Sequence, residues 1–196
     1  MSIRKDEDVA TSVEDLILDA ARSCILDFGI RRTTLAEIAR RAGVSRPTVY
    51  RRWSDTRAVV ADLMTREIAA VMPVPDPTAT RRTQLADSAV TVAERMCAHP
   101  LFDKILKFDQ DMFGTYVFER LGTSQKAAIE LVSAGVLAGQ DDGSIRSGDS
   151  RHMATMLLLM VQSVVQSMNM VSSEMHIDDV LTELRAAVDS YLAPAR

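Results

Sequence analysis

The sequence predicts an all-α fold built from a small basic N-terminal helical unit and a larger acidic helical unit. Three observations support this prediction. Apolar residues recur every three or four positions along most of the 196 residues, as they do on one face of a helix. Glycine (8) and proline (6) are scarce and aromatic residues make up only 5%, whereas a β-rich fold needs many turns and many aromatic or β-branched residues. Pro73, Pro75 and Pro77 interrupt the helical pattern once, so we expect domains at residues 1–72 (core 13–60) and 78–196.

The first two helices have clear start and stop signals. An apolar stripe runs from Val13 to Phe28, and Gly29 follows where a helix would end. The second helix is predicted to start after Thr34. Thr34 and Glu37 have the spacing of a capping box, in which each side chain satisfies an amide of the other residue. Gly43 is the predicted end of this helix.

The third helix is predicted to be short, from Arg46 to Trp53. Ser45 is its expected N-cap, and Pro47 falls in the first turn, where a missing N–H costs nothing. Ser54-Asp55 then caps a longer helix that reaches Met72.

The larger unit shows further helical stripes and no internal repeat. Residues 140–149 read as a polar loop, with Gly143 and Gly148. The predicted helices cover residues 85–96, 101–108, 112–121, 127–137, 153–170 and 178–192.

Charge is unevenly placed along the chain. The stretch from Arg22 to Arg57 holds nine arginines against three acidic residues, a net charge of +6, although the whole chain carries −4. A basic segment on an acidic protein indicates binding to a polyanion; the alternative is a solvated helical face that is merely basic. Cys24 and Cys97 lie far apart, and no export segment precedes them. We therefore expect a cytoplasmic protein with reduced thiols.

One apolar stretch is long enough to span a bilayer. Residues 153–173 contain no charged side chain. Gln162, Gln166 and Asn169 lie within it, however, and lipid would leave their amides poorly satisfied. A helix covered by other helices or by a partner subunit fits better, so we expect no membrane span.

The three short helices around Gly43-Val44-Ser45 describe a helix-turn-helix. At 100° per residue, Val49 and Trp53 share one face of the third helix and would point inward. The outward set then offers guanidinium groups, a hydroxyl, a phenol and a proline surface. These groups suit base edges, thymine methyls and phosphates. The predicted outward residues are Arg46, Pro47, Thr48, Tyr50 and Arg51.

The stretch from Phe28 to Trp53, FGIRRTTLAEIARRAGVSRPTVYRRW, resembles the DNA-binding signature of the TetR family of bacterial transcriptional regulators. The similarity runs from about Val13 to Val60, and glycines, caps and the final Tyr-x-x-aromatic group all fall in register. Trp53 takes the place of the usual phenylalanine and is expected in the core. The family often has a phosphate-contacting lysine at the start of the fourth helix, and this chain has Arg57 one position on.

The resemblance implies a DNA-binding surface on a dimer. Thr34 would touch phosphate, and the implied set of DNA contacts is Thr34, Ser45, Arg46, Pro47, Thr48, Tyr50, Arg51, Arg52 and Arg57. Two members of this set have an alternative interpretation. Tyr50 could be a packing residue of the core, and Thr34 could serve only as a helix cap. The double-stranded operator would be a pseudo-palindrome, because a two-fold pair presents two recognition helices. The homodimer would form through Met153–Met170 and Asp178–Leu192.

The resemblance also implies a ligand cavity in the second domain, and a repressor whose operator binding a small, largely apolar effector relieves. Methionine adapts to variable apolar ligands, and the alternative is that these residues are core or interface. The candidate lining is Met96, Phe102, Phe108, Met112, Phe113, Tyr116, His152, Met156 and Met160.

No catalytic or metal-binding pattern is recognisable in the sequence. The three histidines are isolated, and Cys97-x-His99 has no second pair of ligands. No nucleophile elbow, phosphate-cradling loop or dinucleotide fingerprint occurs, so we expect no cofactor, no metal and no enzyme. Two rival interpretations stay open: an all-α enzyme or carrier, and a helical adaptor for protein partners.

Overall fold

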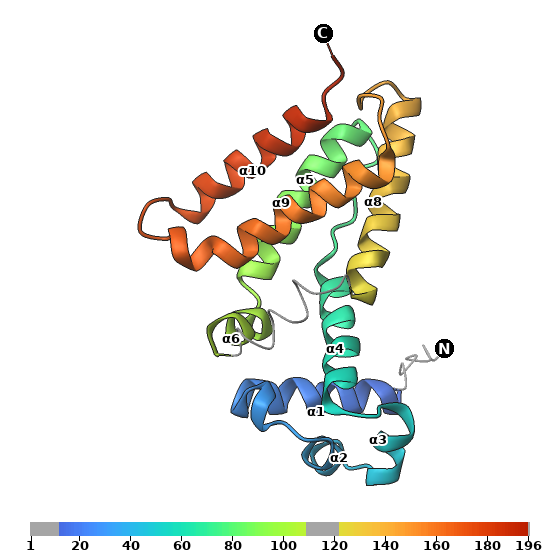
Figure 1. The fold of residues 1–196 in the computed structure, drawn as a ribbon, viewed down its shortest axis with the longest axis vertical. Helices are drawn as coiled ribbons and strands as arrows, with labels where there is room; N and C mark the ends of the chain where they lie inside the picture. Colours follow the sequence, from blue (N-terminus) through green and yellow to red (C-terminus); the bar gives the residue numbers. More distant parts are fainter. Residues whose placement is uncertain (1–11, 109–121, 196) are drawn as a thin grey trace, which may run out of the picture. The chain divides into compact units, whose positions relative to one another are not determined.

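The computed structural model describes residues 12–108 and 122–195, and every regular element within these ranges is a helix (Figure 1). Two compact units divide after Leu63. We name them the N-terminal unit and the C-terminal unit. The division falls inside a helix rather than at the proline run. The separate folding of residues 1–72 and 78–196 stays a prediction.

The N-terminal unit is built on helix signals that the sequence had indicated. Ser12 caps α1, Gly29 ends it with φ at 79°, and Thr34 caps α2. Gly43 closes α2 in the left-handed region. The elements are α1 (Val13–Phe28), the 3-10 helix η1 (Ile30–Arg32), α2 (Leu35–Ala42), α3 (Arg46–Arg52) and α4 (Thr56–Val71).

The core of the N-terminal unit brings one apolar face of each of its helices together. Ile25 of α1, Ile38 of α2, Val49 of α3 and Leu63 of α4 are all fully buried. Because α3 is only seven residues long, Val49 is its one buried residue, and its position depends on contacts at its two ends.

The C-terminal unit consists of longer helices around one core. α5 packs against α10, and α9 packs against both α8 and α5. Val136, Ile145, Leu157 and Val188 are among its buried residues. The helices are α5 (Arg81–Cys97), α6 (Pro100–Phe108), α8 (Thr123–Asp141), α9 (Ser150–Val171) and α10 (Ile177–Leu192). These helices confirm the helices predicted from the apolar stripes. The exception is the helix predicted at residues 112–121, which lies outside the described residues.

Two ion pairs join α5 to α10. Arg82 contacts Asp189 at 3.0 Å, and Arg185 contacts Asp87 at 2.8 Å. These pairs are partly exposed, so they orient the helices more than they stabilise them.

Helix α9 has two very different faces. Met153, Ala154, Leu157 and Val165 are buried, yet only 17% of its most apolar 18-residue stretch is buried. By length and composition alone it is the one helix among the described residues that passes the test for a membrane span. A core helix of a soluble protein passes the same test when it is mostly covered, so the uncovered face of α9 calls for an explanation.

Candidate nucleic-acid interface

A tight turn joins α2 to α3. The Val44 amide donates to the Ala39 carbonyl at 3.1 Å, and the Gly43 amide donates to Arg40 at 3.4 Å. Gly43 has φ at 67° and ψ at 25°, a left-handed conformation that costs most residues strain. The turn therefore sets where α3 begins relative to α2.

Helix α3 separates into a buried face and an exposed face. Val49 is 0% exposed and Trp53, which caps the helix, is 2% exposed. Tyr50 on the other side is 53% exposed, which excludes a purely packing role for its ring. Arg46, Pro47 and Arg51 are exposed as predicted, and Thr48 is half-buried.

Two hydroxyl groups at helix starts are already used as caps. Ser45 Oγ accepts from the Thr48 amide at 3.3 Å and lies 2.7 Å from Thr48 Oγ1. Thr34 Oγ1 accepts from the Glu37 amide at 3.2 Å. Thr34 and Ser45 remain exposed, so each can still face a phosphate while capping its helix.

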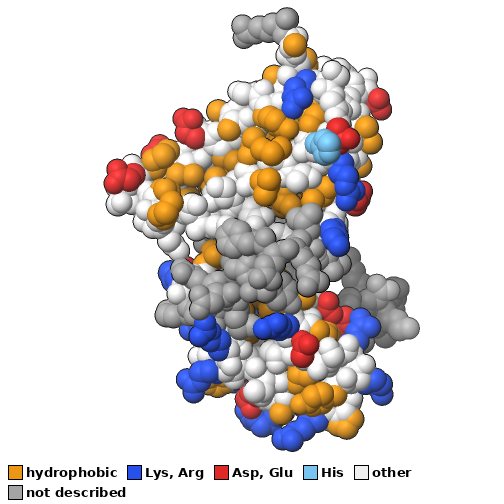
Figure 2. All heavy atoms as spheres, viewed as in Figure 1, with side chains coloured by type: hydrophobic (Ala, Val, Ile, Leu, Met, Phe, Trp, Pro, Cys, Tyr) orange, Lys and Arg blue, Asp and Glu red, His pale blue; other side chains and the backbone are white. Residues whose placement is uncertain are grey.

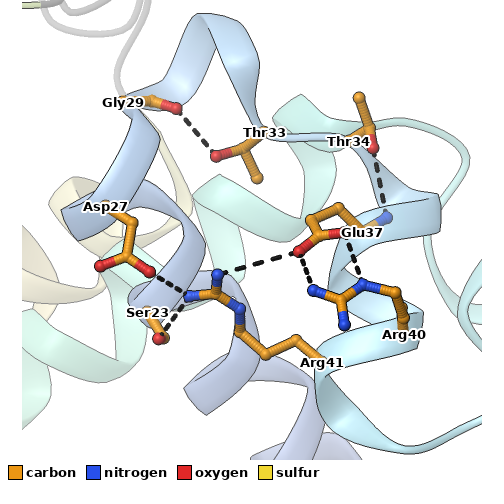
Figure 3. A network of polar contacts seen from close by, with 8 residues as sticks. All are labelled: Ser23, Asp27, Gly29, Thr33, Thr34, Glu37, Arg40 and Arg41. Atoms are coloured by element: carbon orange, nitrogen blue, oxygen red, sulfur yellow. Dashed lines mark hydrogen bonds and ion pairs between the residues drawn. The ribbon is translucent and has the colours of Figure 1, made fainter.

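The second half of the predicted capping box is wrong. The Glu37 carboxylate does not reach back to Thr34; it accepts two hydrogen bonds from Arg40, at 2.6 and 2.9 Å (Figure 3). These bonds, with the nearby charges of Arg40 and Arg41, hold the pKa of Glu37 below its usual value. A bidentate guanidinium partner three residues away outcompetes a single backbone amide.

Arg41 ties α2 to α1 across the same network. Its guanidinium donates to Asp27 at 2.5 Å and to Ser23 at 2.7 Å, and lies 3.8 Å from Glu37. It also sits 5.3 Å from the centre of the Phe28 ring. Figure 3 shows the side chains of Ser23, Asp27, Glu37 and Arg41 converging between the two helices. Arg41 is thus a structural residue of the unit, with its side chain only 22% exposed.

The C-terminal end of α3 is held from two sides. The buried Trp53 indole N–H donates to Asp62 of α4 at 2.8 Å. Arg52 contacts the carboxylate of Glu14 in α1 at 3.0 Å. The sequence analysis predicts neither of these two contacts, with Asp62 or with Glu14. A buried indole N–H does indicate that some acceptor must exist, but not where it lies in the chain.

The remaining basic side chains stay on the outside of the N-terminal unit. Arg31, Arg32 and Arg57 are exposed, as are Arg46 and Arg51. Figure 2 shows basic side chains, all of them arginines, over the part of the surface formed by α2 and α3. The outward face of this unit therefore presents several exposed arginines.

The residues predicted to line an effector cavity differ in burial and in location. Phe102 is buried with its ring against His99, and Met96 is partly buried against the core of the C-terminal unit. His152 and Met156 are exposed, and Met156 and Met160 line an open groove. Met112, Phe113 and Tyr116 lie outside the described residues, as does the side chain of Phe108. The described members of the set do not line one enclosed cavity.

The chemistry available elsewhere is sparse. The described ranges hold no group of three or more His, Cys, Asp or Glu residues that could bind a metal. Both cysteines are unbridged, and burial raises the pKa of each thiol.

A glycine turn, a capped short helix with one buried face, and an exposed basic and aromatic face together define a helix-turn-helix DNA-binding protein. The match of residues 17–63 to the family described as "Bacterial regulatory proteins, tetR family" agrees with this class. An uncharacterized HTH-type transcriptional regulator of Mycobacterium bovis is 46% identical over 176 residues, which cover 90% of this chain and 92% of the relative. The chain belongs to the TetR family of bacterial transcriptional regulators.

Solved structures agree at the level of the fold. The TetR regulator TylP from Streptomyces fradiae has a TM-score of 0.67 at 17% identity, covering 95% of this chain and 89% of its own. The flavonoid-responsive regulator FrrA has a TM-score of 0.64 at 19% identity, covering 91% and 94%. Membership of this family, carried by the matched residues 17–63 and by the 46% identical relative, makes the protein a DNA-binding transcriptional regulator.

Proposed function

We propose that α3 reads operator DNA from the major groove. Arg46, Pro47, Tyr50 and Arg51 face base edges, with Thr48 beside them. Thr34, Ser45, Arg52 and Arg57 face phosphates. The observation that carries the proposal is the contrast on α3 between fully buried Val49 and exposed Tyr50 and Arg51. It leaves one polar and aromatic face free for a groove.

Arg51 provides the test of this reading. Operator sequences are first selected from a pool of random duplexes with the full chain. If Arg51 holds a base edge, Arg51→Ala weakens operator binding by about 1–3 kcal/mol and relaxes the preference at one base pair. If it holds a phosphate, the variant weakens all sequences alike and lowers the salt dependence. Unchanged binding to every duplex would remove Arg51 from the interface.

We also propose a homodimer through α9 and α10, within Met153–Met170 and Asp178–Leu192. A shallow groove of about 520 Å³ lies between these helices and is almost entirely apolar. Its apolar lining includes Met156, Leu159, Met160, Val164, Val180 and Leu184. A second copy would cover the exposed face of α9, and two-fold pairing would set the recognition helices roughly 34–36 Å apart on one side of the duplex.

We further propose that the protein is a cytoplasmic repressor released by a small, largely apolar ligand. The methionine-rich C-terminal unit supports this, since thioether side chains adapt to varied apolar surfaces. The fold neighbour FrrA is described as flavonoid-responsive, so this architecture is compatible with a small organic effector.

A ligand panel tests the proposed release. Compounds are screened for a rise in melting temperature and then for loss of operator binding, because a ligand must bind the two states differently to shift the equilibrium. An enzyme or carrier would bind ligand without any effect on DNA. An adaptor would bind neither ligand nor a preferred duplex.

A further inference from the structure

Arg52 differs from its neighbour Arg51 in its surroundings. Its Nη2 lies 3.0 Å from Glu14 Oε2 and 3.1 Å from Oε1, across 38 residues of chain. Its guanidinium carbon is also 6.0 Å from the centre of the Trp53 ring. The Arg52 guanidinium is therefore directed toward α1 by a carboxylate.

The pair is open to solvent. The side chains of Arg52 and Glu14 are 59% and 44% exposed, so a phosphate oxygen can approach the guanidinium from outside. Exposed ion pairs stabilise a fold little, because water and salt screen them. The contact therefore contributes little to folding, and it leaves the guanidinium within reach of a phosphate oxygen.

The position of the pair gives it a role in DNA binding. In helix-turn-helix proteins the N-terminal residues of the recognition helix contact base edges, and flanking groups contact the backbone. Arg52 is the last residue of α3, where a basic side chain would reach phosphate rather than bases. A carboxylate beside it both occupies the guanidinium and repels phosphate.

We propose that Glu14 is a positioning residue that competes with the DNA backbone for Arg52 and so limits the sequence-independent part of DNA affinity. In this arrangement Arg52 contributes less than one full phosphate contact, although it lies on the recognition helix. An affinity made mostly of phosphate contacts would hold the regulator on any duplex. Glu14 keeps one such contact weak.

Binding to a mixed-sequence duplex of about 25 base pairs tests this, with fluorescence anisotropy at salt concentrations from about 0.05 to 0.3 M. Glu14→Gln frees Arg52 while keeping the size of the side chain. One added phosphate contact steepens the log–log salt slope by up to about 0.9, which corresponds to binding up to about eightfold tighter at 0.1 M salt.

Asp15→Asn is the matched control. It removes one negative charge from the same first turn of α1. The Asp15 carboxylate accepts a hydrogen bond from the Ser12 hydroxyl, and the Asp15 backbone amide donates to the Ser12 oxygen. We expect a gain of less than about twofold from this control, because the Arg52 guanidinium contacts Glu14 and not Asp15, so the Asp15 charge acts on it only through high-dielectric water. Arg52→Gln, added to Glu14→Gln, should return both affinity and slope to about the wild-type values.

Each other result overturns the proposal. Equal gains from the two α1 variants would mean a general charge effect. No gain from Glu14→Gln, together with a loss from Arg52→Gln alone, would mean that Arg52 already binds phosphate beside Glu14. Melting curves of all variants check that the fold is kept. Failure of the unmodified protein to bind any duplex would instead contradict the DNA-binding function itself.

Discussion

Gly43 shows how one residue controls the placement of the recognition helix. Its backbone is left-handed, with φ at 67°, and a Cβ there would meet nothing within 4 Å. Space is therefore not the obstacle to substitution. The obstacle is the conformation, which β-carbon-bearing residues adopt at a cost of about 1–2 kcal/mol.

We expect Gly43→Ala to lower the free energy of unfolding by about 1–2 kcal/mol, as measured by urea denaturation. Gly43→Asn is the matched control, because asparagine tolerates the left-handed region better, and it should cost less. Equal losses for the two variants would mean that strain at φ is not the cause.

Trp53 makes a second residue-scale prediction possible, because it is the one tryptophan in the chain. Its buried N–H donates to Asp62, which is itself exposed. Asp62→Ala leaves the indole N–H buried without this acceptor, and we expect a loss of about 1–3 kcal/mol. Asp62→Asn keeps an oxygen acceptor and should lose less.

Intrinsic fluorescence gives a direct reading of the same contact. In Asp62→Ala the emission of Trp53 should shift while the helical circular dichroism stays unchanged. An unchanged emission spectrum, with unchanged stability, would show that the Trp53–Asp62 bond does not persist in solution.

At the scale of elements, the network on α2 links stability to pH. The pKa of Glu37 is lowered from 4.5, chiefly because Arg40 donates hydrogen bonds to its carboxylate. A carboxyl group with a lower pKa in the folded chain binds fewer protons there than in the unfolded chain. Its stabilising contribution is therefore present above the unfolded pKa and is lost as the pH falls through the folded one.

We expect Glu37→Gln to flatten the dependence of melting temperature on pH between about pH 5 and pH 3. Arg40→Gln should flatten it too, since it removes the main cause of the lowered pKa. Curves parallel to that of the unmodified chain would contradict the network in Figure 3.

The elements also show what a sequence can and cannot reveal. Helix ends at Gly29, Thr34, Gly43 and Ser45 were predictable because caps and left-handed turns act within a few residues. The inward positions Val49 and Trp53 followed from helical periodicity. The contact of Arg52 with Glu14 was not predictable, because no local pattern records which of several carboxylates lies beside an arginine 38 residues away.

The capping box failed for a related reason. The spacing of Thr34 and Glu37 was right for the motif, but the pattern ignored Arg40, a stronger partner on the same helix face. The candidate effector residues share an apolar or aromatic character and an approximate place in the chain, which is all that the sequence provides for them. Those that lie within the described residues do not line one enclosed cavity. The direction of each side chain depends on tertiary packing, which residue type and chain position do not determine.

At the scale of the whole molecule, the uncovered face of α9 is the feature that a single chain leaves unexplained. Met156 is 41% exposed, Leu159 48% and Met170 76%, on a helix with no charged residue between Arg151 and its end. A contiguous apolar face of this kind indicates an interaction surface. The proposed dimer would cover it by the hydrophobic effect.

Leu159→Glu tests the dimer, because it places a charge among the apolar side chains that line the groove between α9 and α10. We expect light scattering to change from twice the 21.6 kDa chain mass toward the chain mass itself. Operator affinity should fall at the same time, because the two recognition helices would no longer be held as a pair. Val74→Glu is the control, since Val74 is 95% exposed in the proline-rich segment and a charge there meets only water. A wild-type chain that scatters as a monomer at micromolar concentration, or a Leu159→Glu variant that keeps the dimer mass, would rule out this interface and leave the apolar face of α9 to some other partner.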